Sequence, residues 1–291
     1  MFTVHLDESY GTANAYSVAG YVATVEQWGE LEREFQELAA QEDYKVLHKV
    51  DLEHFKDEFE WLYLSQDEKV ARRTRINRRA CGIILRRVRA GFGVSVVKSN
   101  WAEVDKGKWA AIIGESFYAA GTFGCMALIS KWADYFQVND SIWYVFERGA
   151  EGRDETEKML RRIENNPESR SLFRMSGWSF ESKKDETTRK GTFYSAVIPL
   201  QSADFLAYEV YRHMDNQVLG GRKFDSQGNP IWTRRALRCL IQNTPEYARY
   251  VELPTNKKPT PHYLRWLNKA DLLGLLETLE AAFGADARII W

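Results

Sequence analysis

The sequence contains no run of about 18 apolar residues, the length that a membrane-spanning helix requires. Its first residues, Met1 to Glu8, have neither the basic start nor the apolar stretch of a signal peptide. We therefore expect a cytoplasmic protein with no membrane partner.

Cysteine is scarce and widely spaced, because Cys81, Cys125 and Cys239 lie far from one another and form no CxxC pair. This usage argues against a disulfide framework and against a zinc site, and it fits a reducing compartment. Walker-type phosphate loops, dinucleotide fingerprints and the GxSxG and HExxH motifs are absent too. The enzyme classes that depend on these motifs therefore have no support.

The overall composition is that of an ordinary globular protein, but one stretch of the sequence is unusual. Of the 291 residues, 44% are apolar and 28% are charged, and the net charge is −1. Between Val70 and Ala102, however, there is no acidic residue, while eight arginines and Lys98 contribute positive charge. The sequence therefore predicts a basic surface somewhere on the protein.

Hydrophobic periodicity predicts strands that alternate with helices after an opening hairpin. We expect strands over residues 1–7, 16–24, 44–47, 92–97, 142–146 and 175–181, and a polar, irregular segment over residues 48–59. We expect helices over residues 28–41, 67–90, 109–136, 153–165, 199–214, 233–242 and 261–283. This order is typical of a three-layer α/β/α fold with a mixed sheet and added helices. We place one domain over residues 1–216 and a C-terminal helical extension, packed on it, over residues 217–291.

Three carboxylates interrupt or end segments that otherwise belong in a core. Asp7 ends the first predicted strand, Glu147 follows the apolar strand over residues 142–146, and Asp204 lies early in the helix that begins at Pro199. A carboxylate in such a place must be hydrogen-bonded, paired, bound to a metal or protonated. These three residues are therefore candidates for a shared site.

Carboxylates that converge from separate elements are the ligands that two Mg²⁺ or Mn²⁺ ions need in phosphodiester cleavage. Each residue also has a plainer interpretation. An aspartate at a strand end commonly forms a turn, and one early in a helix complements the helix dipole. The hypothesis of a two-metal site held by Asp7, Glu147 and Asp204 therefore depends on the three residues occurring together, and not on any one of them.

Short motifs in the same order resemble a known family. They are Asp7-Glu8-Ser9, then His48 with Asp51, then Leu200-Gln201-Ser202-Ala203-Asp204. Over about residues 1–212 they resemble the family called domain of unknown function 3800. The resemblance implies a ribonuclease H-like fold, with Asp7 and Asp204 as metal ligands and Glu147 as the third. The helix over residues 28–41 lengthens the usual order, and Glu147 stands where an aspartate is commoner.

Neighbours of these residues complete the predicted site. Glu8 shares it only if the strand bends, because consecutive strand residues point to opposite faces. We expect Ser9, next to Glu8, to support the predicted site. Gln201 lies one turn before Asp204 on the same helical face, so it can orient a ligand or bond to neighbouring backbone.

Three further side chains are candidates with two interpretations each. His48 can shuttle a proton or contact a phosphate in catalysis, or it can be a buried structural histidine. Lys183 and Lys184 precede the helix of Asp204, and we expect them to bind nucleic acid unless they are merely solvated.

The basic stretch falls on the predicted helix over residues 67–90, whose exposed arc carries Arg72, Arg75, Arg79 and Arg86. Because arginine suits bidentate contact with phosphate, we expect nucleic acid to bind this face. The alternative is that the arginines pair with the acid-rich segment from Glu26 to Glu42.

Together these features predict a Mg²⁺- or Mn²⁺-dependent nuclease, with RNA slightly favoured as substrate, acting in RNA processing or antiphage defence. The alternative is a non-catalytic module that binds nucleic acid or assembles with partners and whose acidic cluster is structural or vestigial. A phosphohydrolase of small nucleotides is a third hypothesis.

Overall fold

A six-stranded mixed sheet lies at the centre of the computed structural model, in the order β5-β4-β1-β2-β3-β8. The structure describes residues 1–11, 14–104, 115–187, 193–194, 196–215, 240, 260–267 and 272. The strands of the sheet are β1 (Phe2–Tyr10), β2 (Ala15–Thr24), β3 (Ala90–Val97), β4 (Ile142–Glu147), β5 (Met175–Glu181) and β8 (His262–Leu267). The first three strands pair antiparallel, whereas β4 and β5 run parallel to β1, and β8 runs parallel to β3. Two short strands, β6 (Glu186–Thr187) and β7 (Phe193–Tyr194), form a separate antiparallel pair.

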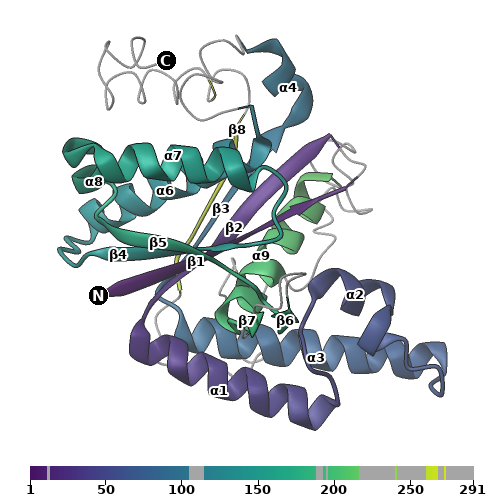
Figure 1. Ribbon diagram of the computed structural model, residues 1–291. Helices are drawn as coiled ribbons and strands as arrows, with labels where there is room; N and C mark the ends of the chain where they lie inside the picture. The colour runs from purple at the N-terminus through teal and green to yellow at the C-terminus, as the bar shows by residue number, and fades with distance from the viewer. Residues whose placement is uncertain are drawn as a thin grey trace, which may run out of the picture.

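Helices cover both faces of the sheet (Figure 1). One face packs against α6 (Phe117–Tyr135), α7 (Arg153–Asn165) and α8 (Pro167–Leu172). The other face packs against α1 (Val25–Glu42), α3 (Gln66–Arg87) and α9 (Pro199–His213). Shorter elements are α2 (Lys49–His54), the 3₁₀ turn η1 (Asp57–Phe59) and α4 (Lys98–Glu103). The protein is therefore an α/β protein whose mixed sheet and helices are compatible with the predicted three layers.

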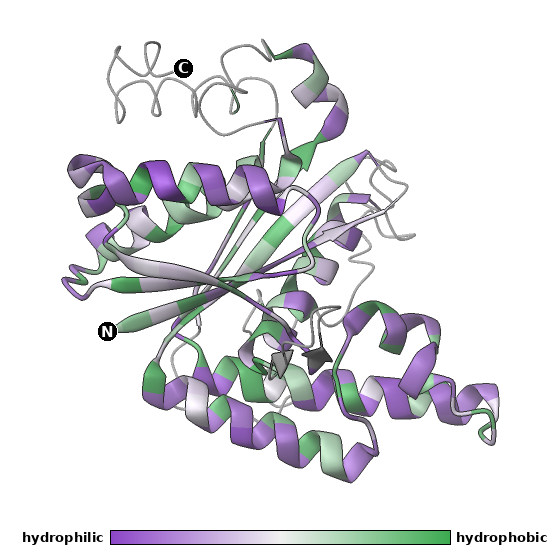
Figure 2. Ribbon diagram, viewed as in Figure 1, coloured by the Kyte–Doolittle hydropathy of each residue, from purple (hydrophilic) through white to green (hydrophobic). Residues whose placement is uncertain are grey.

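Local sequence explains where the main helices begin and how closely they approach the sheet. Thr24 and Gln27 form a capping box at the start of α1, and Ser65 and Glu68 form one at the start of α3. Both helices carry polar residues on one side and apolar residues on the other (Figure 2). In α6, a Cβ atom at Gly121 would lie 2.6 Å from a Val18 methyl group. The glycine therefore lets α6 lie close against β2.

The opening hairpin and the strands β3, β4 and β5 confirm the periodicity argument, but the structure contradicts three of the predicted segments. Residues 44–47 form no strand, and the segment expected to be irregular holds α2 and η1. The helix predicted from residue 261 is wrong at its start, because residues 262–267 form β8. Within the described ranges, no helix is long and apolar enough to cross a membrane.

The predicted boundary at residue 216 does not coincide with the edge of the sheet. Strand β8 lies beyond that boundary and yet pairs with β3 along its length. The predicted helix over residues 233–242 lies outside the described residues except for Leu240, which is buried. The first residues of the helix predicted over 109–136 also lie outside the described ranges.

Candidate active site

Two parallel strands bring Asp7 and Glu147 to the same end of the sheet. Leu6 of β1 pairs with Phe146 of β4, so the next residues along each strand are neighbours. Leu6 and Phe146 face the core under α6, which leaves Asp7 and Glu147 on the α9 side. Both carboxylates are buried.

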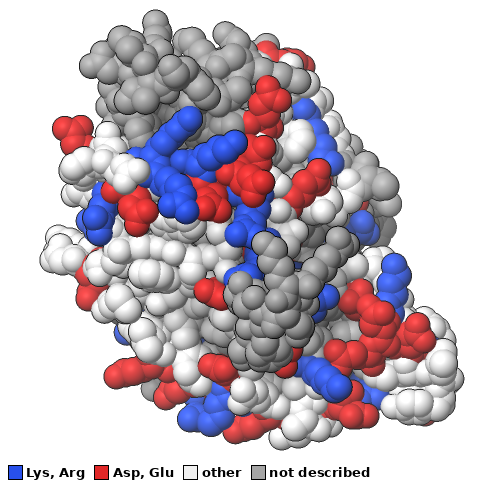
Figure 3. All heavy atoms as spheres, viewed as in Figure 1, with Lys and Arg blue, Asp and Glu red and all other residues white. Residues whose placement is uncertain are grey.

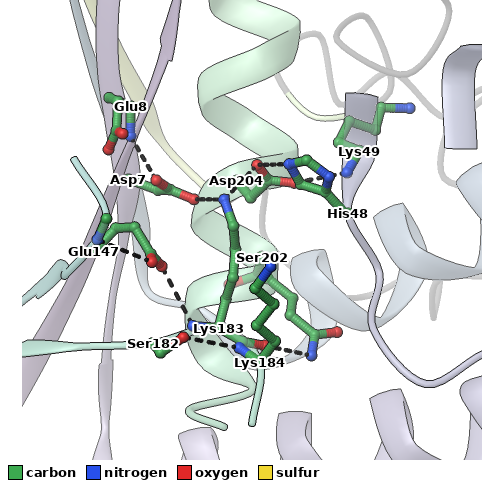
Figure 4. A network of polar contacts seen from close by, with 12 residues as sticks. Asp7, Glu8, His48, Lys49, Glu147, Ser182, Lys183, Lys184, Ser202 and Asp204 are labelled. Carbon is green, nitrogen blue, oxygen red and sulfur yellow. Dashed lines mark hydrogen bonds and ion pairs between the residues drawn. The ribbon is translucent and has the colours of Figure 1, made fainter. Parts of the chain in front are cut away.

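Helix α9 supplies the third carboxylate. It packs across β1 and β2, and Asp204 lies in its second turn, 3% exposed. In Figure 4 the Asp204 carboxylate lies between the Lys183 ammonium, which faces Asp7, and the His48 ring. The structure therefore brings together the three residues that were predicted as a set from distant parts of the sequence.

Lys183, in the loop after β5, lies between two of these carboxylates (Figure 4). Its ammonium nitrogen is 2.8 Å from Asp7 Oδ2 and 3.0 Å from Asp204 Oδ1. Its backbone N–H donates to Glu147 Oε2 at 3.3 Å. Lys183 thus contacts all three carboxylates, whereas Lys184 beside it is exposed.

Glu8 and Ser9 continue β1 past Asp7. The backbone N–H of Glu8 donates to Asp7 Oδ1 at 2.8 Å, and Glu8 Oε2 is buried with no hydrogen-bond partner among the residues that the structure describes. In Figure 4 the Glu8 side chain points away from Asp204. Ser9 is buried, two residues beyond Asp7 along the strand. Glu8 therefore adjoins the cluster from the opposite face of β1, as strand alternation requires.

Segment 47–51 closes the site from the side of α2. The backbone N–H of Lys49 donates to Asp204 Oδ2 at 2.7 Å. His48 places Nε2 3.7 Å from Asp204 Oδ1, while its Nδ1 lies 2.5 Å from Asp51 Oδ2. The imidazole is about one-third exposed, so His48 is a half-buried rim residue that Asp51 orients toward the cluster.

Gln201 links the loops on either side of the site. Its Oε1 accepts from the Leu47 N–H at 3.0 Å, and its Nε2 donates to the Lys183 carbonyl at 3.2 Å. Of the two roles considered for Gln201, the structure shows the bond to neighbouring backbone. The residue therefore fixes the two segments that carry His48 and Lys183.

The buried charges repel one another unless a cation compensates them. Burial, followed by the negative charge of Asp7, raises the pKa of Glu147 to about 7 and holds the pKa of Glu8 well above its usual range. Burial also raises the pKa of Asp7, against the opposing effect of Lys183. Burial acts the same way on Asp204, but Lys183 and His48 outweigh it and lower the pKa of that carboxyl. The cluster thus contains more carboxyl groups than the single charge of Lys183 compensates, and the raised pKa values of Glu147 and Glu8 favour their protonated forms.

Carboxylate oxygens from β1, β4 and α9 are suitable ligands for a hard divalent cation. The unpartnered Glu8 Oε2 adds one more buried oxygen at the same end of the sheet. As they stand, however, no three His, Cys, Asp or Glu side chains in the described part of the chain form a ready-made metal site. The Lys183 ammonium, which bridges Asp7 and Asp204, already engages two of the oxygens that a metal would need.

No family model, curated protein or solved structure matches this chain. The resemblance to domain of unknown function 3800 therefore stays an expectation based on short motifs.

Arginines of the basic helix α3 form ion pairs with glutamates of α1. These glutamates belong to the acid-rich segment from Glu26 to Glu42, as the alternative interpretation expected. Arg75 forms a bidentate pair with Glu42, through Nε at 2.6 Å and Nη2 at 2.7 Å. Arg72 and Arg79 also approach Glu42, at 3.5 and 3.9 Å, and Arg86 contacts Glu34 at 2.6 Å. Figure 3 shows acidic and basic side chains interleaved in the lower part of the molecule, where α1 and α3 lie. Contact between this face and nucleic acid stays a prediction.

Sequence reasoning missed one buried cation next to the site. Lys49 is fully buried, and its Nζ lies 2.6 Å from Glu53 Oε1 and 3.1 Å from Glu209 Oε1. The ammonium also lies 4.2 Å from the ring centroid of Phe205. These contacts fasten α2 to α9 beside Asp204. The only sequence signal was the Lys49/Glu53 spacing of four, which occurs on many solvated helices.

Proposed function

We propose that the protein is a metal-dependent nuclease of ribonuclease H-like fold that cleaves phosphodiester bonds of nucleic acid. One observation carries the proposal: Asp7, Glu147 and Asp204 converge, buried, from two adjacent parallel strands and a crossing helix. Burying that many like charges is costly, so such a cluster is commonly retained for a function. The mixed sheet between helices supports the same proposal.

A bound Mg²⁺ or Mn²⁺ would supply an activated water and stabilise the leaving oxygen of the substrate. Asp7, Glu147 and Asp204 are the residues that would hold it. Lys183 competes for two of these carboxylates, so it has to give way when a cation binds. Its charge then remains next to the site, where a phosphate group would meet it. His48, held through Nδ1 by Asp51, presents Nε2 at the rim for proton transfer.

The alternative is a structural ion-pair cluster in a protein that binds nucleic acid without cleaving it. The specific observation in its favour is that Lys183 already pairs with Asp7 and Asp204. This alternative predicts no response to divalent cations.

Paired melting curves test the proposal before a substrate is known. Wild type, Asp7→Asn and Asp204→Asn are melted with and without Mn²⁺, and Asp140→Asn serves as the control because Asp140 is 56% exposed and lies just before β4. Binding linkage stabilises the wild type and the control by about 2.7 kcal/mol at a Mn²⁺ concentration 100 times its Kd. The two site variants gain less, and they lose cleavage of single-stranded and duplex RNA and DNA. If Mn²⁺ stabilises none of the four proteins, the cluster is structural.

A further inference from the structure

A short stack of aromatic rings lies at the same end of the sheet as the carboxylate cluster, on the opposite, α6 face. Tyr10 at the end of β1 stacks on Tyr16 of β2, with ring centroids 5.1 Å apart and planes 7° apart. Tyr16 stacks in turn on Phe117 at the start of α6, at 5.9 Å and 24°. Phe117 contacts Trp101 of α4, with centroids 5.8 Å apart. Four rings from four elements thus support one another.

The inner rings of the stack are held in place, whereas the outermost ring, that of Tyr10, is exposed to solvent. Tyr16 is 2% exposed, and its hydroxyl donates to the Glu151 carbonyl at 3.4 Å. Tyr10 is 47% exposed. One face of Tyr10 lies against Tyr16, and much of the remaining ring meets solvent. Such a ring is ready to stack on a flat ligand, because little side-chain freedom is lost when the ligand binds.

The open ring lies close to the proposed catalytic residues. Tyr10 follows Asp7 by three residues, roughly 10 Å along an extended strand. It shares a strand face with Glu8, which adjoins the cluster from that side. Lys98 adjoins the stack, because its Nζ is 6.0 Å from the Phe117 centroid and donates to the Gly11 carbonyl, next to Tyr10, at 3.4 Å. A cation and a supported aromatic ring therefore lie at the same end of the sheet as the carboxylate cluster.

We propose that Tyr10 is a stacking platform for an unpaired base of a single-stranded nucleic acid whose backbone passes the carboxylate cluster. The inference rests on the proposed nuclease function and adds the substrate class: single strands, bound with little base preference. Every base has a π face, so stacking on an aromatic side chain tolerates any sequence. Bases of an intact duplex are stacked on each other, so a duplex cannot use the platform without opening.

Fluorescence anisotropy with labelled oligouridylate and oligothymidylate, in the absence of divalent cations, tests the platform without cleavage. Tyr10→Ala should weaken binding about 5- to 150-fold, the span expected when one base–aromatic stack is lost. Tyr10→Phe should bind like the wild type, because it keeps the ring. Tyr135→Ala is the matched control, since Tyr135 is 81% exposed at the C-terminal end of α6, away from Phe117 at its start, and the affinity of this variant should not change.

Oligonucleotides with one abasic site, moved along the strand, identify the stacked base. At one position the wild type should lose as much affinity as Tyr10→Ala loses, and the variant should lose nothing more. Equal affinities of wild type and Tyr10→Ala, in a protein that responds to Mn²⁺, would overturn the platform and leave the proposed nuclease intact. A wild type with neither a Mn²⁺ response nor affinity for either oligonucleotide would overturn both. Melting of Tyr10→Ala near the wild-type temperature confirms that the variant is folded.

Discussion

The Lys183 ammonium lies 2.8 Å from Asp7 Oδ2, although 176 positions separate the two residues. The same nitrogen is 3.0 Å from Asp204 Oδ1, so one side chain is the counter-ion of two buried carboxylates. The proposed metal ligands therefore have an internal cation of their own. If the cluster binds a divalent cation as proposed, this pairing sets the stability of the metal-free protein against its affinity for that cation.

Lys183→Met should destabilise the metal-free protein and increase its response to Mn²⁺. Removing one partner of a buried ion pair leaves the other charge uncompensated, which costs about 3 kcal/mol or more. The variant should then gain more stability from Mn²⁺ than the wild type gains, because no ammonium competes for Asp7 and Asp204. Urea unfolding with and without Mn²⁺ measures both effects.

Lys184→Met is the control for that comparison, because Lys184 is the exposed neighbour of Lys183. It should change stability by less than about 0.5 kcal/mol. A Lys183→Met protein as stable as the wild type would show that the ion pair contributes little. A reduced Mn²⁺ response would show that Lys183 assists the cation.

Glu147 should make the metal-free protein less stable as the pH rises. Its pKa in the folded state is raised from 4.5 to about 7, chiefly by burial and then by Asp7. Between these two values the folded protein keeps a proton that the unfolded chain has lost, so the free energy of unfolding falls with rising pH and levels off above pH 7. The loss is on the order of 3 kcal/mol. Asp7 and Glu8, whose pKa values are also raised, act in the same direction.

Glu147→Gln should flatten this dependence, because the amide does not titrate. Urea unfolding at several pH values between 4 and 8, in the presence of a chelator, compares the variant with the wild type. Parallel pH profiles for the two proteins would assign the dependence to other groups.

Arg75→Ala should lower stability by only about 1 kcal/mol, although Arg75 pairs in bidentate fashion with the buried Glu42. Arg72 and Arg79 stay within 3.5 and 3.9 Å of the same carboxylate and retain part of its compensation. Arg75 is itself half-exposed, so solvent screens the pair. In Glu42→Gln the same arginine substitution should cost less, and urea unfolding of both singles and the double variant gives the difference. Equal costs in the two backgrounds would show that Arg75 acts elsewhere.

Periodicity and strand-end chemistry were sufficient to predict much of the sheet and the three carboxylates. Asp7 and Glu147 were recognised because each was predicted to end a strand that belongs in the core, although β1 continues past Asp7 to Tyr10 in the structure. Asp204 was recognised because it interrupts an apolar helix. These signals are local in the sequence, so each can be recognised without knowledge of the fold.

Local sequence patterns did not reveal which side chains pair with those carboxylates. Lys183 lies in a loop where nothing in the sequence distinguishes it from the solvated Lys184. The burial of Lys49 depends on Glu209, which is contributed by a distant helix. Strand β8 was mistaken for a helix because its apolar residues, among them Tyr263 and Leu267, are spaced four apart, a spacing that fits a helix face. Pairing with β3 decided its conformation, and only the assembled sheet supplies that pairing.

The pairing of β8 with β3 also has a consequence for how the protein is made. Thr260 donates to the Leu85 carbonyl across 175 positions, so one edge of the sheet is completed by a contact of very high sequence separation. Every residue of the carboxylate cluster precedes residue 205. The whole site is therefore synthesised before β8, the strand that pairs with β3. Until then β3 offers an unpaired edge to other chains. Contacts of this range also slow folding, because loop closure has to be achieved first. The nascent chain is therefore exposed to aggregation through β3 until β8 has been synthesised.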